Sequence, residues 1–437
     1  MNRERGTSFF ASLQWFMFML GSSIAFPIII GQLFGLSVGE ISGLMQRTFF
    51  VVGIASFIGG WIGHRLPIVD GPAGIWVGIF ILLGQLAVAR GDGAAAALPL
   101  LEGSMVLAGA LLLIIGAAGW MRWMLRWFTP MVNGVYLIIL SCQLSGVMLQ
   151  GMAGSAHTHP GSFLIAFGVF VFVLSLSIWG RGWLKSFSVL IGMCAGWAIY
   201  AGIYGLGNMP SILTVVQLPD VFAWGGPRLD TGTVLSTLLV TAVLVSSVIV
   251  GTAVMQQVVR EMESAAGRRT PAGEDRLNQG GIANGISNIL SGVFSTIGVV
   301  PFATTTGFVR ITGDTRMGPF LVACIAFAAA AFFPAVYSFL SLLPGPVASG
   351  AMLALFSQMV GIGVSSVLKE QLDQRRLTIL GLSLSIGMGV MFLPQELFAG
   401  LPPVLQYVLS SGVMVGIILS LSLEQLWKSE DTAAHPS

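Results

Sequence analysis

The stretch GVVPFATTTGF, residues 298–308, interrupts an otherwise apolar chain and decides the fold. It combines Pro301 with three consecutive threonines, and Gly298 and Gly307 bracket them. Proline and glycine disfavour a regular helix, so the helical path should break here. Inside a membrane, non-helical backbone is tolerated only where it is buried in protein or lines a cavity. A polar break between two apolar runs therefore indicates a functional element.

The surrounding composition is that of a membrane protein. Of 437 residues, 55% are hydrophobic and only 9% are charged, against about 25% in soluble domains. Apolar runs of 18 residues or more recur, which indicates transmembrane helices in a lipid bilayer. The net charge of +2 gives no indication of nucleic-acid binding. Three cysteines lie inside apolar runs without metal-ligand spacing, so we expect neither a metal nor a cofactor.

Hydropathy and helix breakers divide the chain into fourteen candidate segments. The first seven are 9–31, 42–63, 72–89, 104–120, 128–149, 162–179 and 186–206, and the last seven are 231–257, 279–297, 302–313, 317–340, 345–366, 376–394 and 403–427. With both termini in the cytoplasm, all but three of the 20 Lys and Arg residues fall on the cytoplasmic side. The exceptions are Arg47, Arg90 and Arg228. This bias supports an even number of segments and the cytoplasmic membrane as the location.

A second break, VDGPAGIW at residues 69–76, occupies the matching place in the first half. Seven is odd, so the second half enters the membrane with opposite polarity, as in an inverted repeat. Broken segments 3 and 10 in such a repeat point to a transport site at the midplane. Freed backbone groups and half-helix N-termini can bind a polar ligand there. The alternative is a kinked helix whose threonines bond back to their own carbonyls.

Several longer stretches resemble a known family from end to end. They are LQWFMFMLGSSIAFPIIIG (13–31), LPIVDGPAGIW (66–76), NGISNILSGVFSTIG (284–298), TTTGFVRITGDTR (304–316), LDQRRLTILGLSLSIGMGV (372–390) and LSSGVMVGIILSLSLEQLW (409–427). In order and spacing they are similar to the nucleobase–ascorbate transporters, the xanthine/uracil permeases. Gln14 matches the opening Gln-His pair of that family, whereas Trp15 replaces its histidine.

The resemblance implies an all-α fold of fourteen segments, with short antiparallel strands in segments 3 and 10. It implies a core domain from residues 1–127 and 231–340, and a gate domain from residues 128–230 and 341–437. It further implies a homodimer and the proton-coupled uptake of a nucleobase, a purine such as xanthine, uric acid or guanine, or uracil. The core domain would carry the site up and down against the gate domain.

Two departures from the family pattern concern charge. The family places a glutamate in segment 8 where this chain has Thr252, followed by Gln256 and Gln257. Its Glu or Gln in segment 10, followed by Asn, aligns with Thr304 and Thr305. Both of the usual carboxylates are therefore absent.

Asp70 is the most informative acidic residue, because an intramembrane carboxylate is costly unless it is paired or functional. It would bond the ligand or carry the coupling proton, or else it would pair with Arg65 or Arg310 near the cytoplasmic end. Glu102, near the start of segment 4, is expected at the membrane interface.

The remaining candidates provide flat rings or uncharged polar groups. Trp76 and Phe302 could sandwich a flat ring, or simply pack in the protein. Uncharged donors and acceptors suit the amide-like edge of a nucleobase. The complete candidate substrate site is Asp70, Gly71, Ala73, Gly74, Trp76, Thr252, Gln256, Phe302, Thr304, Thr305 and Thr306.

These patterns favour a secondary transporter for a nucleobase. An anion transporter of the sulfate-permease or bicarbonate-exchanger type is the alternative, because those families share broken helices and helix N-termini attract anions. A membrane enzyme is disfavoured, since the segments hold no Ser/His/Asp set, paired carboxylates or metal cluster.

Overall fold

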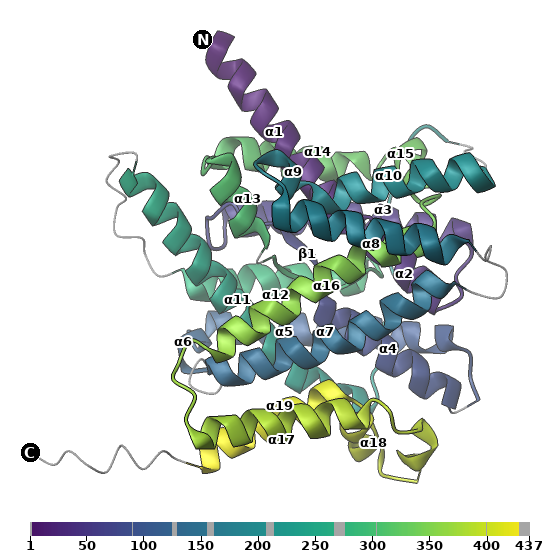
Figure 1. The fold of residues 1–437 in the computed structure, drawn as a ribbon, viewed down its shortest axis with the longest axis vertical. Helices are drawn as coiled ribbons and strands as arrows, with labels where there is room; N and C mark the ends of the chain where they lie inside the picture. The colour runs from purple at the N-terminus through teal and green to yellow at the C-terminus, as the bar shows by residue number, and fades with distance from the viewer. Residues whose placement is uncertain are drawn as a thin grey trace, which may run out of the picture.

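The computed structural model describes residues 2–89, 91–124, 129–154, 161–206, 214–265, 276–302, 304–398 and 400–427. These residues form a helical protein with one small sheet (Figure 1). In the first half the elements are α1 (Asn2–Ser23), α2 (Ala25–Leu33), α3 (Val38–Trp61), β1 (Asp70–Pro72), α4 (Gly74–Ala89), η1 (Ala94–Ala97), α5 (Leu98–Ala117), α6 (Met121–Met124), α7 (Pro130–Ala153), α8 (Ser162–Trp179), α9 (Trp183–Ser186) and α10 (Ser188–Tyr204).

The second half continues in the same manner. Its elements are α11 (Thr231–Ala265), α12 (Leu277–Val293), β2 (Val299–Pro301), α13 (Thr304–Thr312), α14 (Met317–Ala330), α15 (Pro334–Leu340), α16 (Gly345–Val367), α17 (Gln374–Val390), η2 (Gln395–Phe398), α18 (Pro403–Leu409) and α19 (Gly412–Leu426). Strands β1 and β2 pair antiparallel and make the two-stranded sheet.

Seven helical stretches in the described residues are long and apolar enough to cross a membrane. They are Ser8–Leu33, Val38–Trp61, Ala94–Ala117, Pro130–Ala153, Ser162–Trp179, Thr231–Ser264 and Gly345–Val367. The pair α14 and α15 passes the same test together, although it bends by 87° at its break. Helices α4, α10 and α19 are apolar but shorter. The prediction of a helical membrane fold is thus confirmed.

Local sequence explains where several helices begin. Ser37 and Glu40 form a capping box at the start of α3, with the Ser37 N–H donating to Glu40 Oε2 at 2.8 Å. Thr129 caps α7 just before Pro130, whose missing N–H costs nothing in the first turn. Asp373 caps α17 by accepting from the Arg376 N–H at 2.7 Å.

Some predicted boundaries were wrong. Segment 4 was expected to begin at 104, but α5 begins at Leu98 because Pro99 fits a first helical turn. Segment 11 was expected to run unbroken over 317–340, but it bends sharply before Pro334, whose ring cannot continue the preceding helix.

The two halves of the chain make matching helix contacts. Helix α3 packs along α14, and their counterparts α12 and α5 pack along each other. In the same way α8 packs on α10 and on α16, while α17 packs on α19 and on α7. Helix α7 lies against α16, its own counterpart, as β1 lies against β2.

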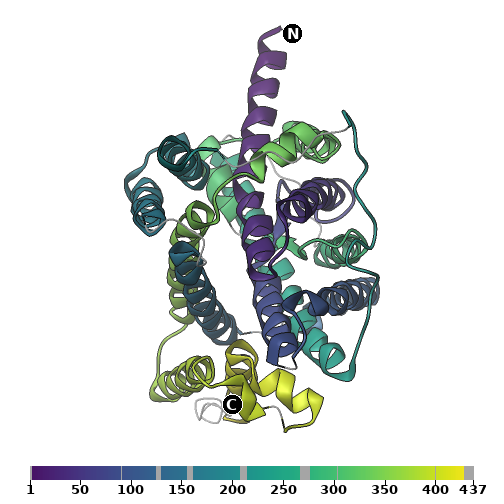
Figure 2. The same cartoon turned by 90° about the vertical axis from the view of Figure 1, so that its right-hand side faces the viewer.

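The helices group into two sets that mainly pack among themselves. One set contains α1, α3, α5, α11, α12 and α14, and the other contains α7, α8, α10, α16, α17 and α19. In Figure 2 the N-terminal helix α1 runs down the middle of the view, with helices of the second set to its left and below it and helices of the first set to its right. Glycines bring some helix backbones into contact: a Cβ on Gly109 of α5 would lie 2.5 Å from the Gly285 oxygen of α12.

Glu102 is buried within the protein. Its side chain is 0% exposed because the segment before α11 covers the start of α5. Glu102 Oε1 accepts from the Trp224 N–H at 3.1 Å and from the Ser295 hydroxyl. Arg47 donates from Nε to the Ser295 carbonyl at 3.1 Å. This cluster ties α3 and α5 to the turn after α12.

Candidate functional site

The two broken segments meet as short strands near the centre of the molecule (Figure 1). Asp70 pairs with Pro301, Gly71 with Val300, and Pro72 with Val299. Beyond the strands, the Ala73 N–H donates to the Gly298 oxygen at 2.9 Å. These bonds replace the helical bonds that the breaks remove.

A helix begins at each exit from the strand crossing. Helix α4 starts at Gly74 and α13 starts at Thr304. The first N–H groups of a helix have no partner within that helix, and they carry partial positive charge. The crossing therefore presents two sets of fixed donors to a polar or anionic group.

The surface that the second helix set presents next to the first helix start is apolar. A Cβ on Gly74 would lie 3.2 Å from Leu144 Cδ1 of α7 and 3.8 Å from Phe356 Cε1 of α16. Gly74 thus faces the second helix set, and its missing side chain lets that set approach. The crossing lies at the boundary between the two sets.

Trp76 holds the crossing together in this conformation. The indole is 0% exposed, and its Nε1–H donates to Asn288 Oδ1 at 2.9 Å. The ring lies against Gly298, where a Cβ would stand only 2.1 Å from Nε1. This placement favours packing, the alternative to ligand stacking.

Asn284 and Asn288 complete the same network, and sequence reasoning missed both. Asn288 Nδ2 donates to the Val299 carbonyl at 3.0 Å, and Asn284 Nδ2 reaches that oxygen at 3.3 Å. Their spacing of four residues places them on one face of α12. That spacing, in a helix otherwise rich in Gly, Ser and apolar residues, was the available signal.

Phe302 covers the backbone of the first strand. A Cβ on Gly71 would lie 2.2 Å from Phe302 Cε2, so only glycine allows this contact. The Phe302 N–H donates to the Val69 oxygen at 2.9 Å, and its ring remains half-buried. One ring face thus packs on the crossing.

The three threonines at the start of α13 have different surroundings. Thr304 is exposed and Thr306 is half-buried, whereas Thr305 is 0% exposed. Thr305 Oγ1 accepts from the Val69 N–H at 3.4 Å. Thr305 therefore joins the two broken segments, and Thr304 is the one open to a ligand.

Thr252 and Gln256 lie on successive turns of α11. Thr252 is buried, and its hydroxyl donates back to the carbonyls of Val248 and Ile249. Its proton is thus used within its own helix. Gln256 is half-buried one turn further along, where its amide remains available.

Asp70 points away from the helix starts, toward α3. Its N–H donates to Ser56 Oγ at 2.9 Å, and the residue is 1% exposed. Asp70 Oδ1 has no hydrogen-bond partner among the described residues. The alternative pairing with Arg310 is not formed, because Arg310 Nη2 lies 3.1 Å from Glu261 Oε2.

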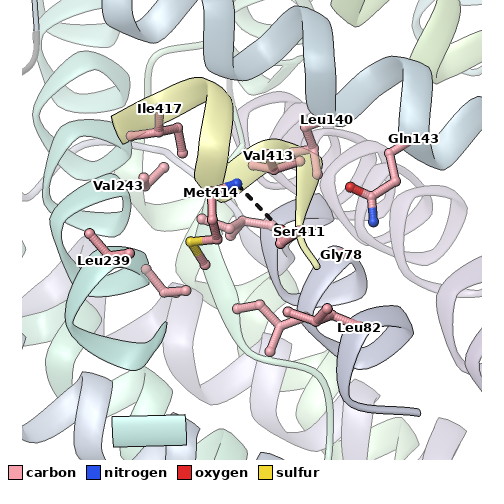
Figure 3. Close-up of a pocket in the computed structure, with 13 residues that line it drawn as sticks. Gly78, Leu82, Leu140, Gln143, Leu239, Val243, Ser411, Val413, Met414 and Ile417 are labelled. Atoms are coloured by element: carbon pink, nitrogen blue, oxygen red, sulfur yellow. Dashed lines mark hydrogen bonds between the residues drawn. The ribbon is translucent and has the colours of Figure 1, made fainter. Parts of the chain in front are cut away.

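An open pocket adjoins the crossing along α4 (Figure 3). Its walls are mostly apolar and come from both helix sets: Ile75, Gly78, Ile79, Leu82, Leu140, Gln143, Leu239, Val240, Val243, Ser411, Val413, Met414 and Ile417. Gln143 and Ser411 are the polar residues of this lining: the buried Gln143 Oε1 has no partner among the described residues, whereas Ser411 Oγ accepts from the Met414 N–H at 3.3 Å. Sequence reasoning missed Gln143, since a single glutamine in an apolar segment gives little signal.

Comparison with known proteins shows what this arrangement belongs to. Residues 6–396 match the model of the Permease family for xanthine and uracil. The chain is 28% identical over 430 residues to the putative purine permease YwdJ of Bacillus subtilis, covering 95% of this chain and 96% of that protein. It is 26% identical to the uric acid permease PucK of Bacillus subtilis over 96% and 95% of the two chains, and 27% identical to the xanthine permease XanP of Escherichia coli over 96% and 92%.

Solved structures share the fold at low identity. The transmembrane domain of the cyanobacterial bicarbonate transporter BicA has a TM-score of 0.60 at 15% identity, covering 96% of this chain and 98% of that one. SLC26A9 has a TM-score of 0.61 at 14% identity, covering 94% of this chain and 65% of that one. The family match and the apolar helices establish an integral multi-pass membrane protein. The chain belongs to the xanthine/uracil permease family, as the sequence resemblance predicted, and is a permease rather than an enzyme.

Proposed function

We propose that this permease is a secondary active transporter that moves a purine base across the cytoplasmic membrane. The observation that carries the proposal is the crossing of β1 and β2, from which two helices start at the boundary between two helix sets. Relatives over nearly the full chain are named as purine, uric acid and xanthine permeases, which favours a purine over uracil.

Fourteen segments in an inverted repeat provide the architecture for this proposal. The exchange of packing partners between the two halves supports the repeat, because a two-fold axis in the membrane plane produces such an exchange. The two helix sets correspond to the core domain of residues 1–127 and 231–340 and the gate domain of residues 128–230 and 341–437. Both termini would lie in the cytoplasm, and two copies would form a homodimer.

The donors at the crossing suit the edge of a purine. The helix starts at Gly74 and Thr304 offer N–H groups to carbonyl oxygens of the base. Thr304 and Gln256 add uncharged polar groups, and the half-buried ring of Phe302 suits a flat ring. Gln143 Oε1 offers an acceptor for a base N–H as the ligand passes through the adjoining pocket.

Transport would follow from movement of the core domain against the gate domain. Gly74 meets Leu144 and Phe356 through apolar contacts, which have no directional bonds to resist sliding. The site lies at this boundary, so an elevator-type displacement would expose it alternately to the two sides. Asp70 would carry the coupling proton, because it is a buried carboxylate in the core domain, and the described part of the chain gives it no ionic partner.

Ligand binding and uptake by purified protein test the proposed substrate. Xanthine, uric acid, hypoxanthine, guanine, adenine and uracil are added in turn, with sulfate and bicarbonate as anion controls. A ligand of the folded state raises the melting temperature. We expect a shift with at least one purine, and saturable counterflow of that purine in proteoliposomes. A shift with the anions alone would replace the proposal by anion transport.

A cross-link between the two helix sets tests the movement. In a variant lacking the native cysteines, Gly74→Cys and Leu144→Cys are introduced together, because Leu144 Cδ1 lies 3.2 Å from the Cβ position of Gly74. Oxidation should abolish purine counterflow, and a reductant should restore it. Each single-cysteine variant is the control and should not respond to oxidation. Full counterflow with the bridge closed would contradict displacement of one set against the other.

A further inference from the structure

His64 is a second buried titratable group beside Asp70. It follows α3, and only 4% of its surface is exposed. Its neighbours in the chain, Ile62 and Arg65, are exposed, so His64 lies just inside the edge of the helix set. The Arg65 N–H donates to the Gly59 carbonyl at 3.2 Å and folds the turn back onto α3.

The imidazole of His64 has a defined orientation. The Leu66 N–H donates to His64 Nδ1 at 3.1 Å. In the neutral ring the proton is therefore on Nε2, which becomes the donor. Nε2 is buried and has no partner among the described residues.

Gly59 brings this donor and the Asp70 carboxylate toward the same point. A Cβ on Gly59 would lie 2.9 Å from His64 Nε2 and 3.1 Å from Asp70 Oδ2. Both polar atoms thus occupy the space that a side chain at residue 59 would fill. They are close enough for a small side-chain rotation, or one bridging water, to join them.

Few other titratable groups surround Asp70. The residues that α3 and β2 place near Asp70 do not titrate: they are Ser56 and Gly59 of α3, and Val299, Val300 and Pro301 of β2. Helix α1 has no titratable residue after residue 5, and α14 contributes the buried thiol of Cys324, which interacts electrostatically with Asp70. Among the described residues, His64 is thus the titratable nitrogen donor beside the carboxylate.

We propose that His64 is a positioning residue for the coupling proton: its Nε2–H stabilises the ionised form of Asp70 and sets the pH at which Asp70 takes up and releases the proton. The inference rests on the proposed function for its role in transport. When Asp70 is protonated, the bond is not required and the two groups can separate. When the proton leaves, the carboxylate draws the imidazole N–H toward it. A proton suits this pair better than a sodium ion, because an N–H donor does not coordinate a cation.

Infrared titration of the reconstituted full-length protein tests the pair without any substrate. The protonated carboxyl band of Asp70 is followed with pH, and it should be absent in Asp70→Asn. In His64→Leu its midpoint should move to higher pH by about one unit, the tenfold change expected for a lost charge-assisted bond. His64→Gln retains a side-chain donor and should recover part of the shift. An unchanged midpoint in His64→Leu would overturn the proposal.

Two further measurements complete the test. The first applies if His64→Leu does not fold, and the second examines the role of Asp70 in transport. Gly59→Ala places a methyl group between the two polar atoms and should shift the midpoint in the same direction, whereas Gly39→Ala on the same helix meets nothing within 4 Å and should not. With a radiolabelled purine that the wild type binds, Asp70→Asn should lose at least tenfold of the accumulation driven by a pH gradient. Accumulation at the wild-type level would overturn the coupling role of Asp70. Absent binding of every purine tested in the wild type would count against the proposed function alone, since the infrared titration judges the pair independently.

Discussion

The two arms of the crossing, β1–α4 and β2–α13, occupy equivalent places in the two halves but are built differently. Helix α4 has 16 residues, its side chains are almost all apolar, and its Trp76 is locked by Asn288. Helix α13 has 9 residues, begins with three threonines and exposes Thr304 and Gly307. The first arm is thus anchored in the protein, and the second is more open.

This difference indicates a division of roles. The anchored arm carries the Asp70 carboxylate and keeps it buried. The open arm presents hydroxyl groups where a ligand can reach them. Substitutions at the buried contacts between the arms should therefore reduce stability, and those at exposed positions of the second arm should change ligand affinity.

The largest effect is expected from the glycines of the second broken segment. Gly298→Ala would drive a methyl group into the Trp76 ring, 2.1 Å from Nε1, and should destabilise the protein by about 3 kcal/mol. Gly307→Ala is the matched control, because a Cβ there meets nothing within 4 Å. It should be neutral or stabilising by about 1 kcal/mol through helix propensity. Thermal unfolding in detergent distinguishes the two, and equal melting temperatures would contradict the anchoring.

A smaller loss of stability is expected when the hydrogen bond between Trp76 and Asn288 is removed. Asn288→Ala leaves the Trp76 N–H and the Val299 carbonyl with fewer partners, at a cost of about 2 kcal/mol. Trp76→Phe removes the indole N–H, which is the donor of the hydrogen bond to Asn288. The double variant should lose less than the sum of the single variants, since both remove one bond. Strict additivity of the unfolding free energies would show that the bond contributes nothing.

The threonines separate stability from binding. Thr305→Val keeps the shape but removes the acceptor of the Val69 N–H, and should cost about 1 kcal/mol. Thr304→Val alters an exposed hydroxyl, so stability should stay within about 0.5 kcal/mol. Its purine Kd, measured by calorimetry, should rise instead. A loss of stability in Thr304→Val, together with a raised purine Kd in Thr305→Val, would contradict the proposed placement of the ligand.

The smallest effect is expected at the far end of the second arm. Arg310 and Glu261 form an ion pair with exposed side chains, so Arg310→Gln should cost less than about 1 kcal/mol. The melting temperature should also respond little to added salt, because the pair is already screened by solvent. A large loss of stability would show that α13 is anchored at this end.

The sequence was sufficient for the breaks but not for the contacts between them. Proline and glycine act locally, so residues 69–76 and 298–308 predicted the two breaks, and a helix starts within each of these stretches. By contrast, the bend before Pro334 was missed, because the apolar pattern continues through it.

The partners of polar residues depend on the tertiary path of the chain. Trp76 meets Asn288 across more than two hundred residues, and Asp70 lies near His64 only because the turn after α3 folds back. Neither proximity follows from spacing or periodicity. The burial of Glu102 depends on the same kind of contact, since the segment that covers it comes from elsewhere in the chain.

A structure determined with a bound purine tests the central claim most directly, which is that the ligand lies at the crossing of the two arms. The account predicts the base within hydrogen-bond distance of the helix starts at Gly74 and Thr304, next to the half-buried ring of Phe302. A base bound elsewhere, with these helix starts unoccupied, would contradict it.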